Sequence, residues 1–475
     1  MLLTRRSLLI TATAIAGCAR SGLGPRRTDP LIDEVERRTF AFFREVFDTR
    51  TGLMPDRWPS PGPCSIAALG FALTAWPIGV ERGWMTRTEA RARTLRTLRF
   101  LHDAPQGPGA SGVSGHRGFF YHFLDMNTGL RFRNSELSTV DTALLFGGVM
   151  FAAGWFDAAS AEEAELRRLA DRIVNRADWP WMQRRGAAIS MGWRPESGFI
   201  ADDWEGYNEG MLVYLLALGS EGRPIGDDGW RAWTRTYPDS WRGGGAGRHL
   251  AFAPHFGHQY SHVWVDFRGI RDEATRQAGF DYFENSRRAT LAQRAYAAAN
   301  PMGWRGYSAD LWGLTACDGP GDLVLEVEGR GRTFRGYSAR GPEGYPDGFD
   351  DGTIAPTAAI ASVAFAPEIV LSAARALTTA QGGRLFGRYG FVDAFNPTLR
   401  AGQSELPTGT VDPEHGWVAR DLLGIDQGPI LAMIANDRDD VVWRVTRRSP
   451  VIRRGLMRAG FEGGWLSRKG PAAAE

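Results

Sequence analysis

The helices predicted from this sequence are of two kinds, which alternate along the chain. Residues 142–156 carry almost no charge, whereas residues 161–177 mix glutamate and arginine around a single apolar stripe. The same contrast recurs in two later pairs, 209–219 with 271–297 and 356–366 with 368–379. A helix that is apolar on every side is buried in a protein core, and an amphipathic helix has one face in water. Repeated pairs of an inner and an outer helix therefore predict an all-α toroid.

Capping signals support these helices, and the pattern of a parallel sheet is missing. Asp29 and Pro30 open a predicted helix, and Thr86–Glu89 and Ser160–Glu163 have the form of capping boxes. Strands do not alternate with helices, so doubly wound folds and β/α barrels are disfavoured. We therefore expect residues 29–475 to form a single domain.

Strand-like and glycine-rich segments predict what lies at the rim of this ring. Leu323–Val327 and Thr333–Tyr337 flank a turn and predict an inserted β-hairpin. Three segments rich in glycine and proline predict long loops over one mouth of the ring, where functional sites tend to be built: 105–115, 243–248 and 341–352.

Residues 1–18 have the order of an export signal. Two adjacent arginines, typical of the twin-arginine route, precede an apolar run that is too short to span a bilayer. Residues 15–18 (IAGC) resemble a lipoprotein processing site, which would leave Cys18 lipidated; the alternative is a plain signal peptide with a chance cysteine. We expect an exported bacterial protein, periplasmic or held on a membrane by this lipid anchor alone, with residues 19–28 as a tether.

The composition excludes some partners and favours others. The formal net charge is only +2, so no nucleic-acid partner is expected. The chain has 17 Trp, 11 Tyr and 26 Phe, which suits stacking on sugar rings but suits a bulky core equally well. After Cys18, only Cys64 and Cys317 remain; they could pair or could be two buried thiols.

Three carboxylic acids are candidates for catalysis. Glu209 stands at the start of a helix whose next residues are apolar, and burial would raise its pKa as a general acid requires. Its alternative role is to stabilise the helix dipole. Asp141 has a structural alternative in a capping box, and Asp393 lies in an aromatic, loop-like stretch.

Three histidines, His255, His258 and His262, have spacings that would align them on a helix face as metal ligands. Gly257 and the alternation that follows the run argue against a helix there, and no H-E-x-x-H pattern occurs. We therefore expect no metal and no cofactor. Hydrogen bonding to a sugar and packing in the core both remain open for these side chains.

Five segments together resemble the bacterial glucoamylase-like family, which includes glycoside hydrolase family 144, the endo-β-1,2-glucanases. They are residues 136–142 (ELSTVDT), 207–209 (YNE), 259–268 (QYSHVWVDFR), 389–397 (YGFVDAFNP) and 424–429 (GIDQGP). The resemblance covers most of the chain, from about residue 30 to 445. It implies an (α/α)6 toroid that hydrolyses β-1,2-glucan with inversion.

The resemblance also implies roles for single residues. Glu209 matches a proposed general acid, Asp141 matches an aspartate important for activity, and we assign the base to Asp393. Aromatic residues would contact sugar rings: Trp204, Tyr207, Tyr260, Trp264, Trp312 and Tyr389. Polar residues would bind sugar hydroxyls: His262, Arg268 and Gln427.

Other functions on the same fold stay open. An exo-acting glucosidase or a transglycosylase would use the same acids, and a non-catalytic envelope lipoprotein would bind glucan without cutting it. In each case the expected partner is a polysaccharide or oligosaccharide, and the expected state is a monomer.

Overall fold

The computed structural model describes residues 29–327, 329–400 and 406–467. The predicted export signal, Cys18 and the tether lie outside these residues. Within the described part of the chain, no helix combines the length and the apolar character that crossing a membrane requires. Cys64 and Cys317 are buried and unpaired with one another.

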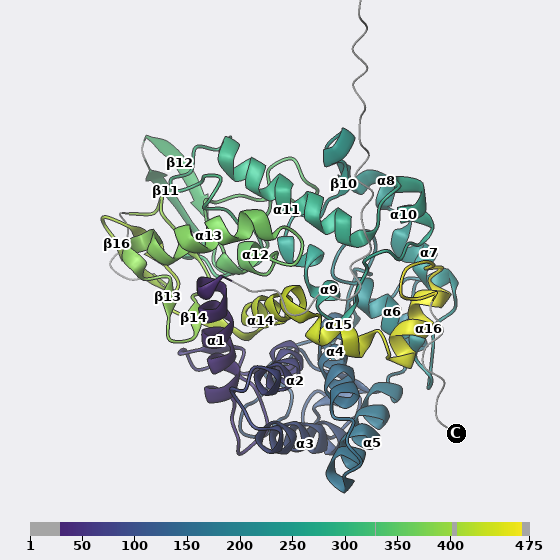
Figure 1. The fold of residues 1–475 in the computed structure, drawn as a ribbon. Coiled ribbons are helices and arrows are strands. Elements are labelled where there is room, and N and C mark those ends of the chain that lie inside the picture. The colour runs from purple at the N-terminus through teal and green to yellow at the C-terminus, as the bar shows by residue number, and fades with distance from the viewer. Residues whose placement is uncertain (1–28, 328, 401–405, 468–475) are drawn as a thin grey trace, which may run out of the picture.

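Six described helices form an inner ring, seen near the centre of Figure 1. They are α2 (Ile66–Glu81), α4 (Thr139–Trp155), α6 (Met211–Gly219), α9 (Tyr260–Trp264), α12 (Pro356–Ile360) and α14 (Gly424–Asp439). The long members are buried on nearly every side, as their lack of charge predicts. The ring closes where α14, close to the C-terminus, packs on α2.

Longer amphipathic helices cover this ring from outside (Figure 1). They are α1 (Pro30–Glu45), α3 (Arg87–Asp103), α5 (Ala161–Asn175), α11 (Tyr282–Ala299), α13 (Pro367–Thr379) and α16 (Pro450–Arg458). Shorter helices fill in the outer layer: α7 (Asp228–Thr234), α8 (Tyr237–Ser240), α10 (Glu273–Ala278) and α15 (Val441–Thr446). The prediction of an all-α (α/α)6 toroid of inner and outer helices is confirmed.

The inner helices begin at one end of the ring, which we call the mouth. Because an outer helix returns the chain after each inner helix, successive inner helices run in the same direction. Short strands lead into several of them and pair across the mouth. The pairs are β2 (Cys64–Ser65) with β5 (Phe123–Leu124), β6 (Leu137–Ser138) with β7 (Gly192–Arg194), and β1 (Arg57–Trp58) with β18 (Leu422–Leu423).

Several predicted boundaries need correction. The single helix expected at 271–297 is two helices, because Gly279 adopts a left-handed conformation (φ 83°) and ends α10 before Asp281 caps α11. The helix expected at 356–366 ends at Ile360. The rim hairpin exists as β11 (Leu323–Val327) and β12 (Arg330–Phe334), so its second strand starts three residues earlier than expected.

Glycines let the two most closely packed inner helices approach each other. A Cβ added at Gly148 of α4 would lie 2.0 Å from the carbonyl oxygen of Gly70 in α2. We expect Gly148→Ala to lower the free energy of unfolding by about 1–3 kcal/mol, because the backbones must move apart. Gly387→Ala, at a position with no atom within 4 Å of the added Cβ, is the matched control. Urea denaturation of both variants measures the difference, and equal midpoints would contradict this packing.

Candidate active site

Glu209 lies at the mouth, directly before α6, and its side chain is almost fully buried. Only 9% of the residue is exposed, and its Oε2 has no hydrogen-bond partner among the described residues. The preceding turn is held by Asn208, whose Oδ1 accepts from the Gly210 amide at 2.9 Å. Burial raises the pKa of Glu209 to about 8, and the negative charge of Asp141 adds to this rise. Glu209 therefore carries a proton at neutral pH.

Asp141 lies in the first turn of α4 and has two polar partners. Ser138 donates its hydroxyl proton to Asp141 Oδ2 at 2.5 Å, and His122 Nε2 lies 3.6 Å from Oδ1. The other ring nitrogen of His122 lies 2.9 Å from Glu136 Oε1, and Arg194 contacts the second Glu136 oxygen at 3.2 Å. Burial raises the pKa of Asp141, while His122 and Ser138 oppose the rise. Asp141 is thus a buried carboxyl group beside an imidazole that stabilises its charge when the ring is protonated.

Asp393 and Asp426, which lies in the first turn of α14, form an acidic pair. The Asp318 amide donates to Asp393 Oδ2 at 2.6 Å, and a side-chain hydrogen bond joins Asp393 to Asp426. Burial raises the pKa of both acids. Nearby carboxylates raise it further: Asp318 acts on Asp393, and Asp393 acts on Asp426. Arg57, 3.0 Å from Asp318, supplies positive charge beside them. A hydrogen bond between two carboxyl groups requires that the pair holds one proton.

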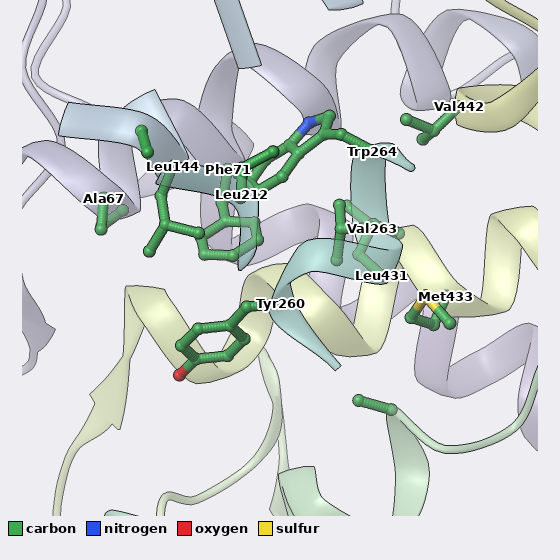
Figure 2. Packing of buried hydrophobic residues seen from close by; sticks show 14 of the residues in the cluster. Ala67, Phe71, Leu144, Leu212, Tyr260, Val263, Trp264, Leu431, Met433 and Val442 are labelled. Atoms are coloured by element: carbon green, nitrogen blue, oxygen red, sulfur yellow. The ribbon is translucent and has the colours of Figure 1, made fainter. Parts of the chain in front are cut away.

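Tyr260, the first residue of α9, lies near Glu209, Asp393 and Asp426. Burial raises the pKa of its phenol, as do the charges of Asp426, Glu209 and Asp393. Figure 2 shows Tyr260 at the edge of the apolar cluster, with its oxygen pointing away from Phe71. The structure therefore brings the three predicted acids together, and we call Asp141, Glu209, Asp393 and Asp426 around Tyr260 the acidic centre.

Of the remaining predicted aromatic residues, two lie beside the Glu209 turn. The Trp204 indole donates to Thr139 Oγ1 at 2.9 Å and covers Gly210. Tyr207 is buried against Tyr282, with ring centroids 5.9 Å apart.

Two more aromatic residues lie elsewhere. Trp312 is fully buried, and its indole nitrogen has no partner in the described chain. Tyr389 packs against the outer helix α1, and its hydroxyl donates to Glu45, the last residue of that helix, at 3.0 Å.

Three predicted sugar contacts have other partners in the structure, which corrects their assignment. Trp264 is completely buried and stacks on Phe71 inside the ring (Figure 2). His262 is buried among phenylalanine rings, and its Nε2 lies 3.0 Å from the Ser286 hydroxyl. Arg268 binds Asp440, which follows the C-terminal end of α14 and so lies at the opposite end of the ring from Asp426. These side chains stabilise the fold.

Gln427 lies next to Asp426 and is buried. Its amide nitrogen donates to the Phe391 carbonyl at 2.9 Å, whereas its Oε1 has no hydrogen-bond partner in the described part of the chain. It therefore fixes the loop that carries Asp393, and its free acceptor lies beside Gly390.

The histidine run does form helix, contrary to our expectation. His255–His258 is a 3-10 turn and His262 lies in α9, because the buried side chains of Tyr260–Trp264 pack into the ring on all sides. Burial lowers the pKa of His255 and of His262 to about 3, so both rings are neutral. The described residues contain no group of three or more side chains suited to hold a metal ion.

Sequence reasoning missed His122, Asp318 and the role of Asp426. Asp426 begins an inner helix as Glu209 does, so the same pattern of an acid before an apolar helix could have identified it. His122 stands between phenylalanines and has no such signal. Cavity volume does not locate the acidic centre either. A cavity of about 790 Å³ lies beside α7 and α10, and none of the four acids of the centre lines it.

The chain is similar to known proteins over most of its length. The profile of the family described as "Putative glucoamylase" matches residues 201–450. An exo β-1,2-glucooligosaccharide sophorohydrolase (non-reducing end) of Parabacteroides distasonis is 26% identical over 466 residues, covering 91% of this chain. The chain spans only 58% of the length of that relative.

Solved structures share the fold. A "putative glucoamylase" of Bacteroides uniformis is 29% identical with a TM-score of 0.77, covering 93% of this chain and 100% of the other. An endo-β-1,2-glucanase of Chitinophaga pinensis, in complex with sophorotriose and glucose, is 24% identical with a TM-score of 0.77, covering 92% and 98%. At this level of identity the second likeness concerns the fold alone.

Proposed function

The chain belongs to the family described as putative glucoamylases, and from that premise we propose that it is a glycoside hydrolase that cleaves β-1,2-glucan. The observation that carries the proposal is the protonated, buried Glu209 in the same centre as Asp141 and the Asp393–Asp426 pair, which shares one proton. Two carboxyl groups in opposite protonation states are what glycoside hydrolysis requires. The names of the relatives supply the linkage.

Each carboxyl group has a defined part in the proposed reaction. Glu209 gives its proton to the glycosidic oxygen as the bond from C1 to that oxygen breaks. Asp393, ionised through its shared proton with Asp426, removes a proton from a water whose oxygen bonds to C1 on the opposite face. The anomeric configuration inverts, and in a substrate complex we expect the two carboxyl groups roughly 6.5–9.5 Å apart.

The mode of attack separates two candidates. We propose internal, endo cleavage, and the alternative is release of disaccharides from the non-reducing end, because the curated relative carries that name. Incubation with glucans of defined linkage, followed by chromatography of the products, tests both. Endo cleavage yields mixed lengths early, whereas exo cleavage yields disaccharide from the start. If no reducing ends are released from β-1,2-glucan, the hydrolase proposal fails, and binding of glucan without cleavage is the function that remains.

The protonation state of Glu209 predicts the alkaline side of the pH profile. Burial raises the pKa of Glu209 to about 8, so the acid form is lost above that pH. We expect the alkaline limb of kcat/KM to have its midpoint near pH 8, and kcat/KM to fall about tenfold per pH unit above it. Initial rates between pH 5 and 10 measure the limb. A flat profile through pH 9 would contradict Glu209 as the acid.

We also propose that the protein is exported, lipidated at Cys18 and active as a monomer. The pattern of residues 1–18 supports export, and the near-zero net charge fits a neutral glucan substrate. In cells, we expect Cys18→Ser to shift the protein from the detergent phase to the aqueous phase in Triton X-114 partitioning. Unchanged partitioning of the variant would exclude the anchor.

A further inference from the structure

We propose that Glu136, His122 and Asp141 form a relay in which a protonated His122 keeps Asp141 ionised, and that the relay thereby keeps the acid proton on Glu209. The inference rests on the proposed function, which assigns that proton to the glycosidic oxygen. His122 is here a positioning residue, since it acts through Asp141. We call the three residues the acid–histidine relay.

The geometry places one imidazole between two carboxylates. His122 Nδ1 lies 2.9 Å from Glu136 Oε1, and Nε2 lies 3.6 Å from Asp141 Oδ1. Both carboxylates lie within ion-pair distance of the ring, and opposite charges at that distance stabilise a positive charge on it. The arrangement therefore favours the imidazolium form over either neutral tautomer.

The backbone and the ring of His122 are both fixed. Its amide donates to the Glu136 carbonyl at 2.9 Å, and its own carbonyl accepts from the Ile66 amide at the start of α2 at 3.3 Å. The ring stacks on Phe123 with centroids 3.8 Å apart. Turning the imidazole away from Asp141 would break its contact with Glu136 and its stacking on Phe123.

The surrounding charges support a cation at this position. Besides Glu136 and Asp141, the carboxylate of Asp56 lies near His122. The nearby cations each contact one of these acids: Arg194 contacts Glu136 at 3.2 Å, and Arg57 contacts Asp56 at 3.0 Å. Although burial alone would lower it, Asp141 and Glu136 raise the pKa of His122 to about 9. In turn, the hydrogen bond from His122 lowers the pKa of Glu136 to about 2.

The relay reaches Glu209 through the charge of Asp141. Glu209 faces Asp141 and the phenol of Tyr260, and no described cation pairs with its carboxyl group. If His122 were neutral, the buried Asp141 would bind a proton more readily, and its charge would no longer oppose ionisation of Glu209. Glu209 would then lose its proton at lower pH.

The direct test is an NMR titration of the His122 ring in the full chain, which needs no substrate. Comparison with His122→Asn assigns the resonance among the 8 histidines. We expect His122 to titrate near pH 9 and to shift downward in Glu136→Gln, which keeps a hydrogen-bond acceptor but removes the charge. Titration near the ordinary value of about 6.5 would overturn the relay.

Kinetics supply the second readout. We expect His122→Asn to move the alkaline limb of kcat/KM downward by about half to one pH unit. The matched control is His102→Asn, since His102 also contacts a carboxylate at 2.9 Å, from Asp103, but lies on the surface. An unchanged limb in a folded variant would overturn the relay. If His122→Asn does not fold, Glu136→Gln takes its place, with a smaller shift in the same direction.

These outcomes separate the relay from the proposed function. If the wild-type protein does not hydrolyse β-1,2-glucan but His122 titrates near pH 9, the function fails and the charge arrangement stands. If hydrolysis occurs and the limb does not move, the relay fails and the function stands.

Discussion

Glu209→Gln is expected to abolish hydrolysis of β-1,2-glucan while leaving the fold intact. Glutamine has the same shape but cannot donate an acidic proton to the glycosidic oxygen, so we expect kcat to fall by about 10²–10⁴-fold. Initial rates on β-1,2-glucan measure the loss. The matched control is Glu205→Gln, because Glu205 lies in the same segment but pairs with Arg235 at the surface, 2.6 Å away. We expect this control to retain nearly full activity.

The stability of the same variant provides an independent check. Glu209 is protonated in the folded chain up to pH about 8 but ionises near 4.5 when unfolded. Between these values the folded state binds one more proton than the unfolded state, so the wild-type free energy of unfolding falls as pH rises. Glu209→Gln removes this dependence. Urea denaturation at pH 5 and pH 8 should therefore show the variant gaining stability relative to wild type; parallel curves would contradict a raised pKa.

Asp393→Ala is expected to lower kcat on β-1,2-glucan by about 10²–10⁴-fold, because the attacking water loses its base. Sodium azide, which attacks without a base, should restore cleavage and give a glycosyl azide of inverted configuration. The control is Asp421→Asn, because Asp421 lies 3.7 Å from Arg57, close to the Asp393–Asp426 pair, but its carboxylate accepts from the Ser60 amide at 3.0 Å. Full activity of Asp393→Ala without azide would exclude Asp393 as the base.

Asp426→Asn separates the two members of the acidic pair. An asparagine amide can still donate to Asp393, but more weakly than the shared proton of Asp426, whose hydrogen bond lowers the pKa of Asp393, so Asp393 should ionise at higher pH than in the wild type. We expect the acid limb of kcat/KM to move upward while kcat at the optimum changes less than in Asp393→Ala. A loss as complete as that of Asp393→Ala, with no shift of the limb, would assign the base to Asp426.

Much of the acidic centre was accessible from local pattern. Glu209, and Asp141 in its capping position, were recognised because an acid precedes or enters a helix without charge. The proximity of Asp393 to Asp426 was not, since 33 positions separate them. Their segments are brought together by the pairing of β15 (Phe395–Asn396) with β17 (Gly416–Val418) and by the Asp393 amide, which donates to the Asp421 carbonyl at 3.0 Å. Asp318, which contacts Asp393, and Arg57, which contacts Asp318, also come from distant parts of the sequence, so their proximity could not be predicted either.

Residues that look alike in the sequence were separated by the fold. Tyr260, His262 and Trp264 lie in one aromatic, polar stretch, and sequence reasoning treated them alike. In a helix of five residues inside the ring, Tyr260 points to the mouth while Trp264 and His262 face the packed interior. Their local composition could not distinguish these environments, because burial depends on the helices that surround them.

Helical periodicity and the contrast between charged and uncharged helices were sufficient to predict a toroid, and an acid at the start of a buried helix singled out Glu209 as the candidate proton donor. Such patterns reflect interactions between residues within about one helical turn of each other. Only the closed ring decided three other features. It pairs Asp393 with Asp426, places His122 beside Asp141, and positions Arg268 at the end of the ring opposite Asp426. Protonation depends on burial and neighbouring charge, and both are properties of the assembled fold.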